Sequence, residues 1–141
     1  MGIAHLLRPV VGINLNSQYN SIVVIMSNFP DPNLISAMSQ AGLAPDKGGL
    51  TKAGRAFEKH AQRAPQIWGS LQGDVQMKNQ RGQGILEEII NSPDTEWSQR
   101  HHAMLKKEIL EGKLPDGRGA RWSANGDEFI CFLSPYIYRS N

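Results

Sequence analysis

The segment "RGARWSANGDEFICFLS", residues 118–134, constrains the fold of this chain more than any other feature. Two short runs rich in aromatic and aliphatic residues flank the dipeptide Asn125-Gly126. Asn and Gly tolerate the positive φ angles that a two-residue hairpin loop requires. The segment therefore predicts two antiparallel strands joined by a tight turn, and "LPDG" just before it predicts another turn.

A two-residue loop fixes which residues face one another across the hairpin. The predicted register pairs Ser123 with Glu128, Trp122 with Phe129, and Arg121 with Ile130. Because side chains alternate between the two faces of a strand, one face is expected to be the core. That face holds Ala120, Trp122, Phe129 and Cys131. The opposite, open face holds Arg121, Ser123, Glu128 and Ile130.

The open face of the hairpin has two interpretations. Arginine grips a phosphate with a fork of N–H donors, and a serine hydroxyl adds a hydrogen bond, so Arg118, Arg121 and Ser123 are suited to hold a phosphate. The simpler interpretation is an ion pair between Arg121 and Glu128 on a hydrated sheet face, and the pattern alone favours it.

Helices are predicted ahead of the hairpin. The stretch "LTKAGRAFEKHAQRAP" predicts a helix with Thr51 as N-cap and Pro65 just past its end. A second helix is expected over 79–91, with Asn79 as cap and a core stripe of Ile85, Leu86, Ile89 and Ile90. A shorter helix is expected to begin at Asn33 and to end near Gly42, and residues 66–78 read as a loop punctuated by glycine.

These elements predict an α+β fold in which N-terminal helices pack on a twisted antiparallel β-sheet of the last third. The first strand of that meander lies somewhere in residues 100–113, where the pattern is equally compatible with a helix, and "DTEWSQ" before it reads as a loop. Residues 1–47, with one short strand expected in "SIVVIMS", differ in composition and carry no catalytic pattern. We therefore expect an N-terminal segment over 1–47 and the functional domain over 48–141.

Composition narrows the function classes. The 141 residues suit one domain, and a net charge of +2 is too small to indicate nucleic-acid binding by itself. Cys131 is the single cysteine, which excludes an intrachain disulfide and cysteine-rich zinc sites, and it is expected to be buried as a small apolar residue. The longest apolar run is far too short to span a bilayer, and the N-terminus makes no convincing signal peptide.

The predicted helix over 52–63 carries a basic stripe next to a histidine. The stripe consists of Lys52, Arg55, Lys59 and Arg63, spaced at helical intervals. His60 shares the apolar face with Phe57 and lies where the two faces meet. Its ordinary pKa is close to neutrality, so it is the best candidate for a general acid or base, although a surface histidine without a role has the same pattern.

Two arginines, a histidine and a serine without metal-ligand spacing suit RNA cleavage. In that reaction the 2′-hydroxyl of the substrate attacks the phosphate, and the protein supplies proton transfer and cationic stabilisation. No metal or other cofactor is expected. Neighbouring residues of a strand face opposite ways, so at most one of His101 and His102 can join a given site. His102 is the further candidate for contact with RNA. Tyr138 shares a face with Tyr136 and is a candidate for base stacking, as are Trp68 and Trp97.

Three successive blocks of the chain resemble a known family. The blocks are "GGLTKAGRAFEKHAQR", "NQRGQGILEEIINSP" and "PDGRGARWSANGDEFICFLSP", and the match covers about residues 48–135. They resemble the C-terminal toxin domains of Rhs-repeat proteins and of the CdiA proteins of contact-dependent growth inhibition. That family resembles in turn the barnase, EndoU and colicin D superfamily of metal-free ribonucleases, whose helices pack on a twisted antiparallel sheet.

The resemblance implies a growth-inhibitory endoribonuclease with tRNA as substrate. It implies delivery as part of a larger secreted or cell-surface effector, action in the target-cell cytoplasm, neutralisation by a cognate immunity protein, and in some cases a host activating factor such as a translation elongation factor. Carried over by position, the catalytic residues are His60, Arg118, Arg121 and Ser123. The segment 1–47 would serve passage into the target cell.

The sequence departs from the usual family pattern in places. "HAQR" follows the histidine where the family has a glycine-rich turn, Cys131 stands at a glycine, and Ser134 stands at an acidic residue. Three alternatives remain open at this level. They are a non-catalytic RNA- or protein-binding module, a metal-dependent nuclease, and an immunity protein, although the last would be expected to be acidic and this chain has a pI near 8.8.

Overall fold

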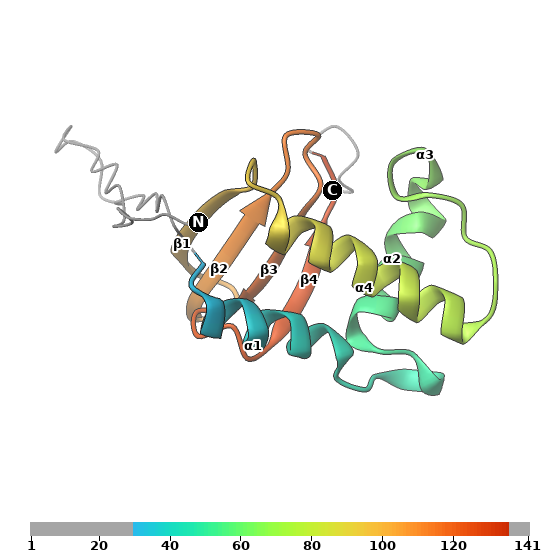
Figure 1. The fold of residues 1–141 in the computed structure, drawn as a ribbon, viewed down its shortest axis with the longest axis horizontal. Helices are drawn as coiled ribbons and strands as arrows, with labels where there is room; N and C mark the ends of the chain where they lie inside the picture. The colour runs from blue at the N-terminus through green and yellow to red at the C-terminus, as the bar shows by residue number, and fades with distance from the viewer. Residues whose placement is uncertain (1–29, 136–141) are drawn as a thin grey trace, which may run out of the picture.

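The structure is a computed structural model and describes residues 30–135. Figure 1 shows helices gathered on one side of an antiparallel sheet. The helices are α1 (Pro32–Leu43), α2 (Lys52–Arg63), α3 (Pro65–Trp68) and α4 (Val75–Asn91), with a short 3₁₀ turn, η1 (Lys47–Gly49), before α2. The strands are β1 (Glu96–His102), β2 (Lys107–Lys113), β3 (Gly119–Ser123) and β4 (Phe129–Leu133). The predicted α+β class is confirmed, while the strand expected in "SIVVIMS" and the residues Tyr136 and Tyr138 lie outside the described residues.

The sheet is a simple meander. Its strands are ordered β1-β2-β3-β4, each antiparallel to the next, so that β1 and β4 form the two edges. Helix α2 packs on α4 and also contacts β4, whereas α1 packs on α4 (Figure 1). The helices therefore cover one face of the sheet, and α2 lies beside the edge strand β4.

Helix α2 begins and ends where the sequence predicts. The Thr51 side chain accepts a hydrogen bond from the Gly54 N–H at 2.9 Å, which satisfies one of the free donors of the first turn. Its apolar side chains Ala53, Phe57 and Ala61 are buried. Pro65, expected just past the end, opens the short helix α3 directly.

Helix α4 begins earlier than the sequence suggests, so the loop predicted over 66–78 is confirmed only for residues 69–74, and its two ends belong to α3 and α4. Asp74 is the N-cap, and its carboxylate accepts a hydrogen bond from the Met77 N–H at 3.0 Å. Asn79, the predicted cap, lies inside α4, where its side chain instead accepts a hydrogen bond from the Thr51 N–H at 2.8 Å. Gly69 and Gly73, which both precede Asp74, are the reason why the sequence pattern indicates a loop here. Asp31 caps α1 in the same way, in place of the predicted Asn33.

One hydrophobic core joins the helices and the sheet. Its largest fully buried side chains include Trp122, Phe57, Phe132, Met38 and Leu86. The Trp122 indole N–H donates a hydrogen bond to the Met38 carbonyl oxygen at 3.1 Å, so β3 is tied to α1. Residues before position 48 thus contribute α1 to the same core as the residues after it.

The meander has one strand more than its sequence pattern clearly indicates. Residues 96–102, read in part as a loop, form β1 and pair with β2. Trp97 packs over Gly112 of β2, where any side chain would collide with the indole ring. Met104 and Leu105, which made a helix plausible, are exposed between β1 and β2. The spacing of these apolar turn residues matches one face of a helix, which is why the sequence pattern is also compatible with a helix.

A register shift in the hairpin corrects the predicted pairing. Trp122 pairs with Phe129 as predicted, but Arg121 pairs with Cys131 rather than with Ile130. The irregularity inserts one extra residue into β4, which is how a β-bulge moves the following side chains to the other face. The prediction that Cys131 belongs to the core is therefore wrong, because Cys131 is half-buried and Phe132 takes the core position.

The close approach of α2 and α4 generates a stability prediction. A Cβ atom added at Gly82 would lie 2.2 Å from the Ala53 carbonyl oxygen, which is backbone and cannot turn aside. We expect Gly82→Ala to lower the free energy of unfolding by about 1–3 kcal/mol, the usual cost of overpacking. Urea unfolding followed by tryptophan fluorescence measures the change.

Gly84 provides the matched control two residues further along α4. Nothing lies within 4 Å of a Cβ atom added there. Gly84→Ala is therefore expected to raise the free energy of unfolding by up to about 1 kcal/mol, because alanine favours the helix. Equal changes in the free energy of unfolding for Gly82→Ala and Gly84→Ala would contradict the close contact between α2 and α4.

Candidate active site

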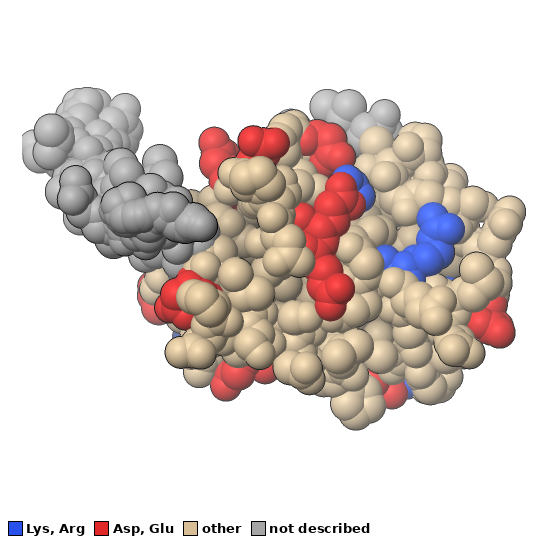
Figure 2. Space-filling model, in the orientation of Figure 1, with Lys and Arg blue, Asp and Glu red and all other residues tan. Residues whose placement is uncertain are grey.

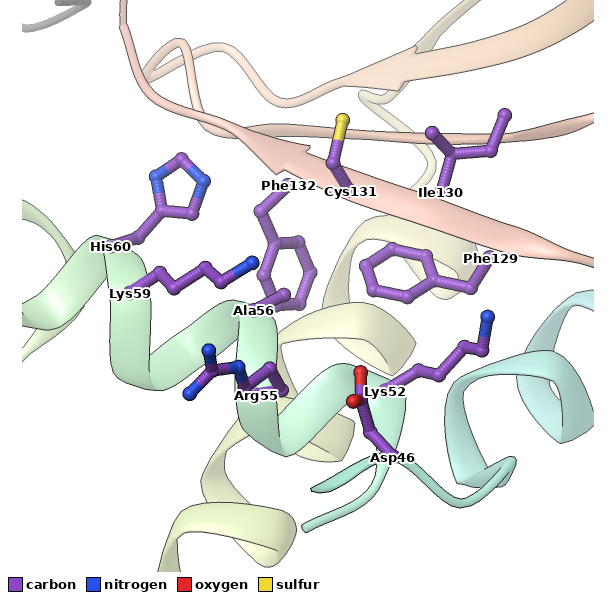
Figure 3. A pocket seen from close by; sticks show the side chains of 10 residues that line it. All are labelled: Asp46, Lys52, Arg55, Ala56, Lys59, His60, Phe129, Ile130, Cys131 and Phe132. Atoms are coloured by element: carbon purple, nitrogen blue, oxygen red, sulfur yellow. The ribbon is translucent and has the colours of Figure 1, made fainter. Parts of the chain in front are cut away.

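A cleft lies between helix α2 and the edge strand β4. Its volume is about 110 Å³, and Figure 3 shows side chains of both elements around it. Helix α2 contributes Lys52, Arg55, Ala56, Lys59 and His60. Strand β4 contributes residues 129–132, and Asp46 lies at one end. The cleft thus combines most of the predicted basic stripe with the predicted acid/base residue.

The local sequence explains why these groups meet. Positions 52, 55 and 59 lie on one side of a helix because they are three or four residues apart. The apolar residue Phe57 is fully buried, which turns that basic side toward the edge of the sheet. Ile130 and Cys131, where the hairpin register shifts, both line the cleft.

His60 is held by side chains from two other segments, helix α3 and the end of β4. Its Nδ1 atom lies 2.9 Å from the Ser134 hydroxyl oxygen. The Trp68 indole N–H donates a hydrogen bond to the same oxygen, also at 2.9 Å. The centroid of the Trp68 ring lies 4.9 Å from that of the imidazole, and the Phe132 ring lies at 6.4 Å. The imidazole is therefore fixed in position at the end of the cleft.

The surroundings keep His60 uncharged. Burial lowers its pKa, the charges of Arg63 and Lys59 lower it further, and contact with the Phe132 backbone partly offsets them, so that the pKa falls to about 4. At neutral pH the imidazole is therefore neutral and has a nitrogen that can accept a proton. This state suits a general base rather than a general acid.

The cations of the cleft differ in how far they are already neutralised. Arg55 makes an ion pair with Glu58 at 3.1 Å, and Lys78 of α4 binds the second oxygen of that carboxylate at 2.9 Å. The hydrogen bond from Lys78 is the main reason why the pKa of Glu58 is lowered. Lys52 and Lys59 make no ion pair with any residue in 30–135, so their charge is directed at the cleft.

Arg118 lies outside the cleft and is bound by acidic side chains. Its guanidinium contacts Glu88 of α4 at 3.0 Å and Asp116 at 2.9 Å, and its own side chain is only 15% exposed. Burial tends to lower its pKa, but the two carboxylates more than offset this and raise it. These contacts tie the turn before β3 to helix α4.

Arg121 lies on the open face of the sheet. Its Nε donates a hydrogen bond to Glu111 of β2 at 2.9 Å, and Arg100 of β1 approaches the same carboxylate at 3.5 Å. Burial acts to raise the pKa of Glu111, but these arginines, with Lys113, lower it on balance. The predicted ion pair between Arg121 and Glu128 is wrong: the antiparallel meander brings Glu111 opposite Arg121.

The remaining predicted site residues are dispersed. Ser123 is engaged in the hairpin turn, where it donates to Asp127 at 2.9 Å and accepts from the Glu128 N–H at 3.0 Å. His102 lies on β1, at the edge of the sheet opposite β4, and accepts a hydrogen bond from the Leu105 N–H. Arg63 is exposed one turn beyond His60. Tyr138 lies outside the described residues.

Sequence reasoning missed the roles of Trp68 and Ser134 at the site. From the sequence, Trp68 is only a candidate for base stacking, and Ser134 is only a departure from an acidic position of the family pattern. The sequence did carry one signal for Ser134. The family pattern has an acidic residue at this position, and such a residue is expected to make a polar contact. Within residues 30–135, no group of three or more His, Cys, Asp or Glu side chains could hold a metal ion.

The fold and the cleft together define a class of protein. It is a small α+β domain with a cationic groove and a neutral, anchored histidine, an arrangement suited to proton transfer beside a polyanion. In the part of the chain that the structure describes, no helix has the length and apolar character needed to cross a membrane.

Comparison with known proteins identifies the family. The family model of the CdiA C-terminal tRNase toxin domain matches residues 39–134, and the chain therefore belongs to this family. The toxin is a nuclease whose class of substrate is tRNA. No curated protein matches the chain.

A solved structure supports the same assignment. It is the toxic C-terminal tip of CdiA from Pseudomonas aeruginosa, determined in complex with an immune protein. The two chains are 34% identical, with a TM-score of 0.59, over 67% of this chain and 99% of the other. The resemblance inferred from the sequence blocks is thus confirmed.

The buried position of His60 generates a prediction about pH. We expect the imidazole to titrate near pH 4, rather than near 6.5 as in an unfolded chain. Because the unfolded chain binds the proton more readily, the contribution of His60 to stability is complete above about pH 6.5. It is lost as the pH falls toward 4. NMR titration of the histidine ring protons measures the midpoint directly.

A substitution separates His60 from the other titrating groups. His60→Gln removes the titrating imidazole. The free energy of unfolding of this variant should therefore fall less between pH 7 and pH 4 than that of the unsubstituted chain. His101, an exposed histidine paired with Glu108, serves as the internal NMR reference. A His60 midpoint near 6.5 would contradict the desolvated site.

Proposed function

We propose that this domain is a metal-independent endoribonuclease that cleaves tRNA in the cleft between α2 and β4, with His60 as general base. Family membership supports the tRNA substrate. The observation that carries the proposal is a neutral, anchored histidine beside Lys52 and Lys59, which form no ion pair with any residue that the structure describes. A base and a cation at one place are the groups that internal cleavage of RNA needs.

The reaction proposed is transfer of the phosphate to the neighbouring 2′-oxygen. His60 accepts the proton of the 2′-hydroxyl while that oxygen bonds to phosphorus, and the bond from phosphorus to the 5′-oxygen breaks. The 5′-oxygen takes a proton from water. The products carry a 2′,3′-cyclic phosphate and a 5′-hydroxyl, and no metal-bound nucleophile takes part.

The cations of α2 are proposed to bind the substrate backbone. Lys59 is adjacent to His60 and is assigned to the scissile phosphate, while Lys52 and Arg55 extend the contact along the helix. Arg63 would contact the backbone beyond the histidine. Positive charge held in place stabilises the additional negative charge of the transition state.

The arginines of the third sequence block have different proposed roles. Arg121 is the cross-strand partner of Cys131, which lines the cleft, so a phosphate that extends over the open face would meet it. Arg118 faces Glu88 and Asp116 and is proposed to support the turn before β3 rather than to touch RNA. Ser123 is proposed to hold the hairpin turn, and His102 and Tyr138 remain candidates for contact with distant parts of the tRNA.

The distribution of charge supports an approach of RNA from the α2–β4 side. Figure 2 shows the face that carries α1 and α4, where acidic side chains form a line and basic ones are few. Glu87 and Glu88 of α4 are exposed. A polyanion is repelled by such a face and attracted by the lysines of the cleft.

Membership of the same family supports a proposal for the partners and for the place of action. The toxic tip of the P. aeruginosa protein is bound to an immune protein, and we propose that a cognate immunity protein neutralises this domain as well. Delivery as part of a larger CdiA effector and action on tRNA in the target-cell cytoplasm complete the proposal. The proposal extends to a host activating factor such as a translation elongation factor, which added cell extract supplies when cleavage is assayed.

Cleavage of tRNA in excess EDTA tests the proposed chemistry. The unsubstituted chain should convert total bacterial tRNA to discrete fragments that end in a 2′,3′-cyclic phosphate. His60→Gln should reduce the rate by about 10²–10⁴-fold, the usual contribution of a general base. His101→Gln, at an exposed histidine on β1, is the matched control and should retain the full rate.

Each alternative gives a different result in this assay. RNA that binds but remains intact, with or without added cell extract, would overturn the enzyme in favour of a binding module. Cleavage that EDTA abolishes and Mg²⁺ restores would establish a metal-dependent nuclease. Cleavage that appears only with extract would retain His60 as base and add a host factor.

Salt dependence tests the cationic cleft. Association with RNA releases counterions, so affinity should fall steeply as salt increases. Lys59→Gln should weaken binding of tRNA and reduce the slope of log K against log salt by about 1, the value for one lost phosphate contact. Filter binding with His60→Gln as the background measures affinity without cleavage.

The control for this measurement is a lysine remote from the cleft. Lys106 is exposed in the turn between β1 and β2, so Lys106→Gln removes the same charge elsewhere. Its salt slope should match that of the background protein. Identical slopes for the Lys59 and Lys106 variants would show that net charge alone, and not the cleft, attracts RNA.

A further inference from the structure

Ser134 occupies an unusual position for a serine. It is only 6% exposed, and it lies just after β4 at the point where α2 and α3 meet the sheet. Its hydroxyl oxygen is 2.9 Å from both Trp68 Nε1 and His60 Nδ1. A buried hydroxyl with these neighbours links the proposed base to the indole of another helix.

The chemistry of the donors limits how this network can be arranged. An indole N–H only donates, so Ser134 must accept from Trp68. Toward His60 the hydroxyl group can then act either as an acceptor or as a donor. The hydroxyl oxygen can accept a hydrogen bond from a protonated His60 Nδ1, or the hydroxyl can donate its hydrogen to an unprotonated Nδ1.

Only one of these arrangements is compatible with a base. If Ser134 donates to Nδ1, the neutral ring carries its proton on Nε2, and Nε2 cannot accept another. If Ser134 accepts from Nδ1–H, Nε2 is unprotonated and can receive the 2′-hydroxyl proton. In the imidazolium both ring nitrogens are donors, so the hydrogen bond from Nδ1 to Ser134 persists when the proton arrives.

We propose that Ser134 is the positioning residue of the site: it accepts a hydrogen bond from the Nδ1–H of His60, is itself oriented by Trp68, and thereby leaves Nε2 as the basic nitrogen. The inference rests on the proposed function in so far as it assigns Nε2 to catalysis. The hydrogen bond and the adjacent indole ring hold the imidazole from two sides. A carboxylate commonly serves this purpose for a catalytic histidine, and here a neutral hydroxyl, polarised by the indole N–H, takes its place.

NMR of the intact 141-residue chain tests the tautomer without any substitution. Two-bond ¹H–¹⁵N correlations distinguish a protonated from an unprotonated ring nitrogen. At pH 7 we expect His60 to show a protonated Nδ1 and an unprotonated Nε2. A protonated Nε2 with an unprotonated Nδ1 would overturn the proposal, whatever the activity of the protein.

Kinetics of Ser134 variants test the consequence for catalysis. Ser134→Ala removes the acceptor and should lower kcat about tenfold while KM for tRNA changes little, since a lost hydrogen bond of about 1.4 kcal/mol corresponds to that factor. The His60 ring should then show a mixture of tautomers. Ser134→Thr retains the hydroxyl and should restore both the single tautomer and most of kcat.

Two further variants complete the test. Trp68→Phe keeps an aromatic ring beside His60 but removes the N–H, and a smaller loss of kcat in the same direction is expected. Ser39→Ala is the control, because Ser39 also uses its hydroxyl, donating to Glu87 at 2.9 Å, but on the α1–α4 side. An unchanged kcat in folded Ser134→Ala would overturn the role, and thermal unfolding of each variant confirms that the protein is folded.

The outcomes separate this inference from the proposed function. A protein with the expected tautomer but no RNase activity would retain the network and refute the enzyme. A protein that cleaves tRNA through His60, but shows the opposite tautomer, would retain the enzyme and refute the role of Ser134.

Discussion

The close contact between α2 and α4 determines the geometry of the remainder of the domain. At Gly82 the backbone of α4 approaches the Ala53 carbonyl of α2 so closely that a methyl group would not fit. Asn79 of α4 also binds the first turn of α2 through the Thr51 N–H. With α2 fixed in this way, Phe57 enters the core, and the basic side of the helix lies along the edge of β4. The cleft exists because the basic side of α2 and the edge strand β4 are held next to each other.

The site combines groups from segments that are far apart in the chain. His60 belongs to α2, Trp68 to α3, and Ser134 follows β4, yet they meet at one buried hydroxyl. Partial burial gives the histidine its neutral state, and Lys52 and Lys59 give the cleft its positive charge, so the same helix supplies the proposed base and the cationic surface beside it.

The charged residues of the third sequence block show how a motif can serve the fold as well as the site. Arg118 joins the turn before β3 to α4 through Glu88, and Arg121 joins β3 to β2 through Glu111. Each of these arginine side chains is less than one-fifth exposed. A charge that is largely removed from water must be satisfied by ion pairs and hydrogen bonds. Recurrence in a family pattern is therefore not enough to show that a residue touches the substrate.

Local sequence determined the α+β class, helix α2 with its Thr51 cap, the pairing of Trp122 with Phe129, the basic stripe and the candidacy of His60. These features depend on periodicity and on turn or cap chemistry within a few residues. The tertiary structure alone decided which acidic partner each arginine meets, because Glu111 and Glu88 approach only when β2 and α4 are packed. It also decided the position of Cys131, since one inserted residue in β4 reverses a face, and the meeting of Ser134 and Trp68 with His60. Contacts between distant segments depend on the packing of the whole domain, which no short stretch of sequence specifies.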